Sequence, residues 1–132
     1  MAIAGNTYTI TLKRTHLEWG THRYTGSRDF IYGEGYIPIP AYVARNFDLF
    51  NDNNARTGLG YNIFNCTSTD GFFNGQVKTS GCSQAGDVHA KNMHGYGDLQ
   101  ALGAWYAHVG AQVGGHVEVT WVSSTDIEIH YY

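Results

Sequence analysis

The chain has 132 residues and a formal net charge of −3 with its histidines neutral. This length supports one domain, residues 1–132, with a sizeable core, and it is too short for two. The sequence contains no apolar run that would span a membrane and no signal-peptide pattern at its N-terminus, so we expect a cytoplasmic protein without a membrane partner.

The first part of the chain predicts two strands, a long loop and a helix. Residues Thr7–Leu12 alternate apolar side chains with threonines, which is typical of a half-buried strand. Residues Lys13–Arg28 show no period, so we expect an exposed, extended loop. A strand broken by glycines is predicted over Asp29–Ile39. Pro40 at the first helical position then predicts a helix over Ala41–Leu49, because the start of a helix leaves that amide unpaired.

The middle of the chain predicts further short strands. Residues Tyr61–Cys66 and Phe72–Thr79 have strand patterns, the second with an expected bulge at Gly75. Between them, Thr67–Gly71 has the composition of a turn. Another short strand is expected over Asp87–Met93. Together with 17 glycines and an aromatic fraction of 14%, these patterns predict a mainly β fold with two short helices.

The second helix is predicted over Leu99–His108, after a sharp corner at His94–Gly97. Asp98 is a good N-cap for this helix, and Gly110 is positioned to end it.

A hairpin is predicted to close the chain. Its strands are His116–Val122 and Ile127–Tyr131, around a polar turn. The side chains expected to point inward are Val117, Val119, Trp121, Ile127 and Ile129.

The sequence shows no signature of catalysis or metal binding. The two cysteines, Cys66 and Cys82, lack a CxxC spacing, so we expect them reduced and partly buried, with a disulfide as the alternative in a secreted protein. The seven histidines lack zinc-ligand spacing. Residues 87–91 (DVHAK) place His89 where a metal-dependent nuclease needs a second carboxylate. We therefore predict a non-catalytic domain with no cofactor and no metal.

The loop Lys13–Arg28 is locally basic although the whole chain is acidic. Its four Lys and Arg residues accompany a single acid, Glu18. Long loops on a compact domain often carry binding residues, so this loop is a candidate site. The alternative is a solvated connection with incidental charge.

Two stretches resemble a known family. The segment YIPIP leading into AYVARNF, and the ending VGGHVEVTWVSSTDIEIHYY, resemble DNA-binding pseudobarrel domains. These include the plant B-three transcription-factor domain and the recognition domains of EcoRII-type restriction endonucleases. The resemblance implies a seven-stranded open β-barrel with a helix at each end. It also implies sequence-specific binding of double-stranded DNA by two arms in the major groove, as the recognition module of a restriction-type system. A nuclease or ATPase would then lie on the same or another chain.

By position, this resemblance places an N-arm at Lys13–Arg28 and a C-arm at Phe72–His94. The candidate DNA-binding residues in these arms are Lys13, Arg14, His16, Trp19, His22, Arg23, Tyr24, Arg28, Gln76, Lys78, Lys91, Asn92 and His94.

In the N-arm, each of the three arginines can bond guanine in bidentate fashion, and Lys13 can neutralise a phosphate. Trp19 and Tyr24 can pack on sugars or on a thymine methyl group. The alternative is that the arginines pair with neighbouring acids.

In the C-arm, Gln76 and Asn92 have the chemistry of adenine readers, while Lys78, Lys91 and His94 suit phosphate or guanine. Gln76 and Lys78 lie at i and i+2, so we expect them on one strand face. The alternative is an ordinary polar sheet face.

Two other functions remain open. Exposed aromatic, Asn and Asp residues on a small β protein also fit a carbohydrate-binding, lectin-like module, and the domain could instead be a protein-interaction subunit. Added salt would weaken DNA binding steeply and leave sugar binding nearly unchanged.

Overall fold

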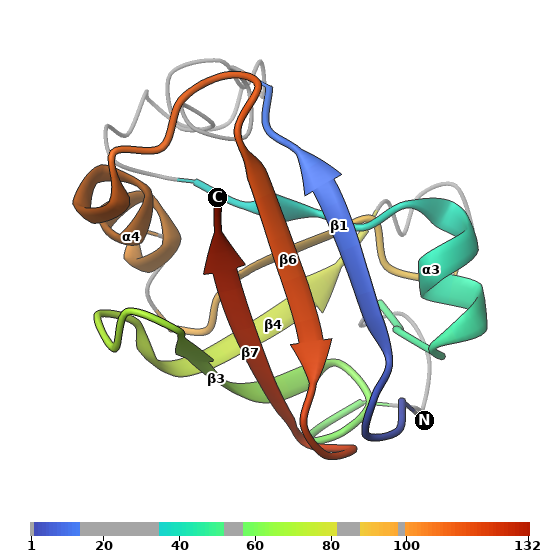
Figure 1. The fold of residues 1–132 in the computed structure, drawn as a ribbon. Coiled ribbons are helices and arrows are strands. Elements are labelled where there is room, and N and C mark those ends of the chain that lie inside the picture. The colour runs from blue at the N-terminus through green and yellow to red at the C-terminus, as the bar shows by residue number, and fades with distance from the viewer. Residues whose placement is uncertain (1, 14–34, 52–56, 82–87, 98–99) are drawn as a thin grey trace, which may run out of the picture.

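The computed structural model describes residues 2–13, 35–51, 57–81, 88–97 and 100–132. They form a seven-stranded mixed sheet, curled into a nearly closed, barrel-like shape, with two short helices (Figure 1), which confirms the mainly β prediction. The strands are β1 (Thr7–Thr11), β2 (Ile37–Pro38), β3 (Ile63–Ser68), β4 (Asn74–Ser80), β5 (Asn92–Gly95), β6 (His116–Trp121) and β7 (Asp126–Tyr131). The helices are α3 (Ala41–Asn46) and α4 (Ala101–Val109).

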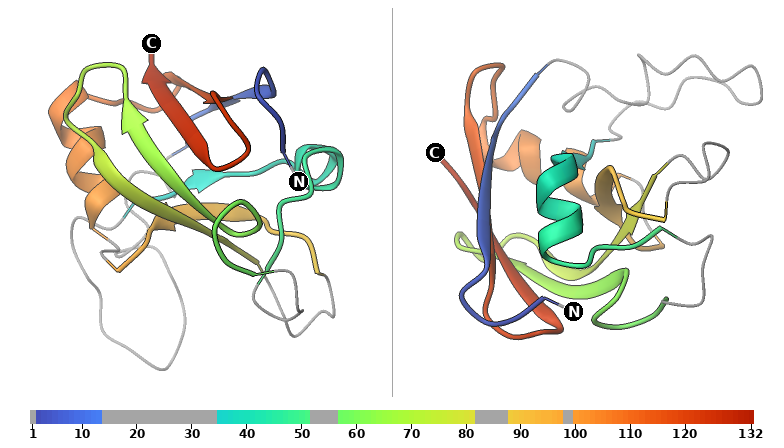
Figure 2. Two further views of the ribbon diagram at one scale, coloured as in Figure 1. Left: turned by 90° about the horizontal axis from the view of Figure 1, so that it is seen from below. Right: turned by 90° about the vertical axis from the view of Figure 1, so that its right-hand side faces the viewer.

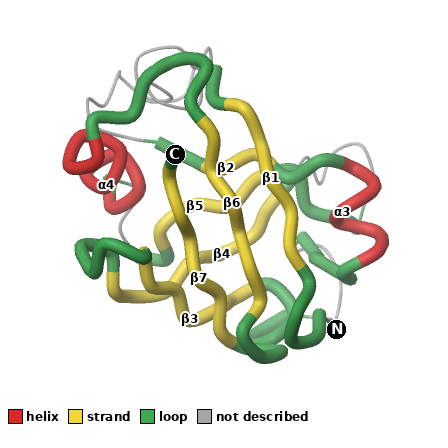
Figure 3. The backbone as a smooth tube through the Cα atoms, in the orientation of Figure 1, coloured by secondary structure: helices red, strands yellow, loops and turns green. Residues whose placement is uncertain are grey.

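The strands lie in the order β1-β6-β7-β3-β4-β5-β2. Every neighbouring pair is antiparallel except β3 and β7, which run parallel. Strands β1, β6 and β7 cross in front of the other four in Figure 1, and Figure 2 shows from two further sides how the sheet folds over on itself. The helices lie on opposite sides of this sheet (Figure 3), as the resemblance implies.

The core fills the inside of the folded sheet. The five side chains predicted to point inward from the closing hairpin are at most 1% exposed, which confirms that prediction and the hairpin itself. Trp121 is central, since its ring meets the edges or faces of Phe47, Phe64 and Tyr8 at centroid distances of 5.5, 5.6 and 6.2 Å. Burial of these large side chains is the main force that holds the two halves of the sheet together.

Helix α3 begins and ends differently from the prediction. Pro40 is the N-cap residue, with φ −58° and ψ 145°, rather than the first helical residue. The helix ends at Asn46 instead of Leu49 because the backbone turns through Asp48, which has a positive φ of 53°. Val43 and Ala44 are the buried residues of the helix, and Phe47, which follows it, packs against the core.

Helix α4 packs closely on the segment that precedes β2. Its C-cap is Gly110 with φ 67°, which confirms the predicted end, while its first residue is Ala101 rather than Leu99. The predicted N-cap, Asp98, lies outside the described residues. A side chain at Gly35 would lie 3.1 Å from the backbone of Gly103, so the close approach of helix and strand requires glycine.

Three predictions for the β3–β5 region are wrong in detail. Thr67 and Ser68, predicted in a turn, belong to β3, because β7 pairs with them. No bulge occurs at Gly75, since the register between β3 and β4 is continuous. A strand was predicted over Asp87–Met93, but the observed strand, β5, extends over Asn92–Gly95. His94 and Gly95, predicted in a sharp corner, therefore belong to a strand that pairs with β4.

Candidate nucleic-acid interface

Six of the thirteen candidate residues lie in the part of the chain that the structure describes. They are Lys13, Gln76, Lys78, Lys91, Asn92 and His94. The other seven, which fall outside the described residues, are Arg14, His16, Trp19, His22, Arg23, Tyr24 and Arg28. Lys13 is exposed and directly follows Leu12, whose N–H donates to the Gly115 carbonyl at 2.8 Å. Lys13 therefore lies just after β1, beside the start of β6.

Four candidate residues share the outward face of β4 and β5. The register pairs Lys78 with His94 and Ser80 with Asn92, and Gln76 precedes Lys78 by two positions. The residues that alternate with them point into the core. The predicted common face of Gln76 and Lys78 is thus confirmed. These four C-arm residues lie on β4 and β5, which hydrogen-bond to each other.

A small hydrogen-bond cluster fixes the side chains on β5. The Ser80 hydroxyl donates to Asn92 Oδ1 at 2.9 Å and lies 3.2 Å from His94 Nε2. His94 Nδ1 also lies 3.3 Å from the Gly95 carbonyl oxygen, so both ring nitrogens have polar partners. Because the Ser80 hydroxyl donates to Asn92, the Oδ1 atom of Asn92 faces Ser80. Asn92 therefore turns its amide N–H groups away from Ser80. Beside this cluster, Lys78 Nζ lies 5.9 Å from the centre of the Tyr96 ring.

Lys91 lies at a different place, in a pocket between α3 and the start of β5. The pocket has a volume of about 270 Å³ and is lined by Ile39, Ala41, Arg45, His89, Ala90 and Lys91. Neither Arg45 nor Lys91 forms an ion pair with a carboxylate among the described residues. Arg45 was not a sequence candidate. These two cations come together because β5 pairs with β2. Next to this pairing, the Ile39 N–H donates to the Lys91 carbonyl at 2.9 Å.

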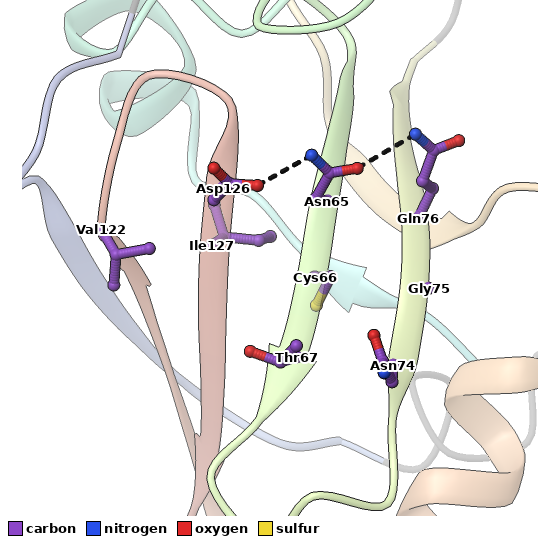
Figure 4. Close-up of a pocket in the computed structure, with 9 residues that line it drawn as sticks. All are labelled: Asn65, Cys66, Thr67, Asn74, Gly75, Gln76, Val122, Asp126 and Ile127. Carbon is purple, nitrogen blue, oxygen red and sulfur yellow. Dashed lines mark hydrogen bonds between the residues drawn. The ribbon is translucent and has the colours of Figure 1, made fainter.

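A chain of hydrogen bonds crosses three strands next to Gln76 (Figure 4). Gln76 Nε2 donates to Asn65 Oδ1 at 3.1 Å, and Asn65 Nδ2 donates to Asp126 Oδ1 at 2.8 Å. Asp126 also accepts from the hydroxyls of Ser123 and Thr125. The hydrogen bonds from Asn65, Ser123 and Thr125 hold the pKa of Asp126 below its usual value. These groups border a shallow pocket of about 310 Å³.

Asn65 and Asp126 border this candidate site and were not among the residues predicted from the sequence. They are 61 positions apart and meet because β3 and β7 pair in parallel. A parallel pairing leaves no short-range signal in the sequence.

A second groove lies between the start of β4 and helix α4. It has a volume of about 300 Å³ and is lined by Phe72, Phe73, Asn74, Gly75, Gln76, Tyr96, Ala101 and Ala104. Phe72 and Tyr96 are each 49% exposed, and Phe72 stacks on His108 with ring centres 4.2 Å apart. The groove thus combines exposed aromatic rings with side-chain amides.

Charged side chains are distributed unevenly over the outer surface of the sheet. The outward residues of β6 and β7 include three acids, Glu118, Asp126 and Glu128, as well as two histidines, whereas β4 and β5 carry no acid and one lysine, Lys78. Repulsion of a negatively charged group is therefore smaller on the β4–β5 side than on the β6–β7 side.

The described residues also bear on metal binding, thiol reactivity and membrane crossing. They contain no group of three or more side chains suited to a metal ion. Burial raises the pKa of the Cys66 thiol to about 12, so this thiol stays protonated and is a poor nucleophile. Among the described helices, none has the length and apolar character needed to cross a bilayer.

Comparison of the chain with models of protein families gives no match, and comparison with curated proteins gives none either.

Proposed function

We propose that this domain binds double-stranded DNA in a sequence-specific manner through two arms in the major groove. The observation that carries this proposal is the gathering of Gln76, Lys78, Asn92 and His94 on one outward face of β4 and β5. The amides of Gln76 and Asn92, which could read base edges, lie on the same face as Lys78, which could neutralise a phosphate, and a groove-reading surface needs this combination.

The fold supports the same proposal. A seven-stranded, barrel-like sheet with helices on opposite sides is the architecture that the resemblance to pseudobarrel domains implies. The Arg45–Lys91 pocket adds two cations without carboxylate partners among the described residues, which suits contact with the DNA backbone.

By the same resemblance, we propose that the domain is the recognition module of a restriction-type system. It binds without catalysing a reaction. A nuclease or ATPase activity would then reside on another part of the same chain or on another chain.

Fluorescence anisotropy with labelled random duplexes tests the binding proposal. We expect the affinity to fall steeply between 50 and 200 mM salt, in proportion to the number of phosphates contacted. The variants Lys78→Ala and Asn92→Ala should weaken binding, and Thr9→Ala, an exposed threonine on the outward face of β1, should not. Equal affinity of all four proteins would place the interface elsewhere, and no binding by the wild type would end the proposal.

The groove beside α4 favours carbohydrate binding as a second candidate. Exposed aromatic rings such as Tyr96 and Phe72, next to the amides of Asn74 and Gln76, can stack on sugar rings and bond their hydroxyls. Binding of an oligosaccharide that is insensitive to salt and lost in Tyr96→Ala would support this candidate over DNA.

A further inference from the structure

The Gln76 amide stands at the end of a hydrogen-bond chain whose direction is fixed by a carboxylate. Ionised Asp126 can only accept, so Asn65 must turn its Nδ2 group toward it, at 2.8 Å. Asn65 Oδ1 then faces Gln76 and can only accept, so Gln76 presents Nε2 to it, at 3.1 Å. Each amide orientation is therefore dictated by the one before it.

The carboxylate at the start of this chain stays ionised. The donors around Asp126 hold its pKa below the usual value for aspartate. At neutral pH, Asp126 therefore acts only as a hydrogen-bond acceptor, and this sets the direction of both hydrogen bonds in the chain.

The hydrogen-bond chain determines which amide atoms of Gln76 face solvent. Its Oε1 lies on the side of the amide away from Asn65 (Figure 4), and Nε2 keeps a second N–H besides the one donated to Asn65. Gln76 is exposed, and no other hydrogen bond of its side chain occurs within the described residues. One acceptor and one donor, side by side, match the N6 amino group and N7 of adenine.

We propose that Gln76 reads an adenine, and that Asn65 and Asp126 make it distinguish A·T from T·A. This inference rests on the proposed binding of duplex DNA. In the major groove the adenine donor and acceptor appear in opposite order in A·T and T·A. An amide held in one orientation fits one order, whereas an amide free to flip fits both. Gln76 is the specificity-determining residue, and Asn65 and Asp126 are positioning residues.

The test compares two duplexes that differ only by exchange of A·T for T·A at one base pair. The site comes from selection of random duplexes with the wild-type protein. We expect the wild type to discriminate between the two duplexes by roughly tenfold to a hundredfold. Gln76→Ala should abolish this preference at that base pair and leave the other positions of the site unchanged.

The variant Asp126→Asn tests the positioning role. Its amide both donates and accepts, so it no longer dictates the orientation of Asn65, and the A·T to T·A ratio should fall severalfold. The lost negative charge strengthens binding to all duplexes alike, so the ratio is the readout. Glu128→Gln is the matched control, because it removes the same charge from the same face of β7 outside the hydrogen-bond chain. Thermal unfolding of each variant confirms that the fold is intact.

The outcomes separate the two proposals. If Gln76→Ala keeps the base preference of the wild type, Gln76 is not a reader and the inference fails while DNA binding stands. If Gln76→Ala loses the preference but Asp126→Asn and Glu128→Gln keep equal ratios, the positioning role is wrong. If the wild type binds no duplex at any salt concentration, the proposed function fails and this inference with it.

Discussion

Asp70 joins the turn between β3 and β4 to helix α4. Its carboxylate accepts hydrogen bonds from the Ser68 hydroxyl, the Phe72 N–H and the Trp105 indole N–H, at 2.6, 2.8 and 3.0 Å. Desolvation raises the pKa of Asp70, but these hydrogen bonds, with a contribution from His108, outweigh it and hold the pKa below its usual value. Trp105 is fully buried, so its N–H depends on this one acceptor.

The free energy of unfolding should therefore depend on Asp70. A carboxyl group whose pKa is lower in the folded state stabilises the protein above its unfolded pKa, and this contribution is lost as the pH falls below about 4. Asp70→Asn turns an N–H toward the Trp105 N–H, so we expect it to cost about 1–2 kcal/mol at pH 7. It should also flatten the loss of stability in acid. Urea unfolding from pH 7 to 3 measures both effects.

Glu118→Gln is the control for this experiment, because it removes one negative charge from the outward face of β6, and the Glu118 carboxylate accepts no such hydrogen bonds from the described residues. Equal stability of Asp70→Asn and Glu118→Gln at both ends of the pH range would contradict the role given to Asp70.

Local patterns in the sequence predicted elements well and their partners poorly. The closing hairpin could be predicted because its alternation and its polar turn are contained in one continuous stretch. The position of β5 could not, because its limits are set by pairing with β4 rather than by its own composition. Gln76 and Lys78 could be placed on one face because they lie two positions apart on the same strand. Asn65, Asp126 and Arg45 could not be predicted, because the residues that they meet at the candidate site come from distant parts of the chain.

The contact between α4 and the entry to β2 depends on one glycine. A Cβ atom at Gly35 would lie 3.1 Å from both the N and Cα atoms of Gly103, and backbone atoms cannot rotate away as a side chain can. We expect Gly35→Ala to cost about 1–3 kcal/mol of stability through this overpacking. Gly75→Ala is the matched control, because a Cβ there meets nothing within 4 Å. Chemical denaturation of the two variants checks this, and equal stability would show that α4 shifts freely.

Across the whole molecule, binding to a polyanion has to overcome a net charge of −3. The described cations are few, and two of them, Arg45 and Lys91, share one pocket at the end of the sheet near α3. If both contact phosphates, Arg45→Gln and Lys91→Gln should each weaken binding to every duplex alike. Each should also reduce the slope of log affinity against log salt concentration by about 1.

Tyr42→Phe on the same helix is the control, because it is exposed and changes no charge. Titrations of a specific and a non-specific duplex at four salt concentrations measure the slopes. Unchanged slopes in both glutamine variants would remove this pocket from the interface.

The parallel pair of β3 and β7 has a consequence for how the molecule folds. In chain order β7 is the final strand described, yet in space it lies between β6 and β3 and supplies the ladder that connects β1-β6 to β3-β4-β5-β2. Until it docks, β3 and β6 are unprotected edges, and an unpaired strand edge is a template for association with another chain. Bringing these distant segments together costs loop-closure entropy before their contacts stabilise the structure, so we expect the protein to fold slowly. We also expect folding intermediates that lack a docked β7 to aggregate.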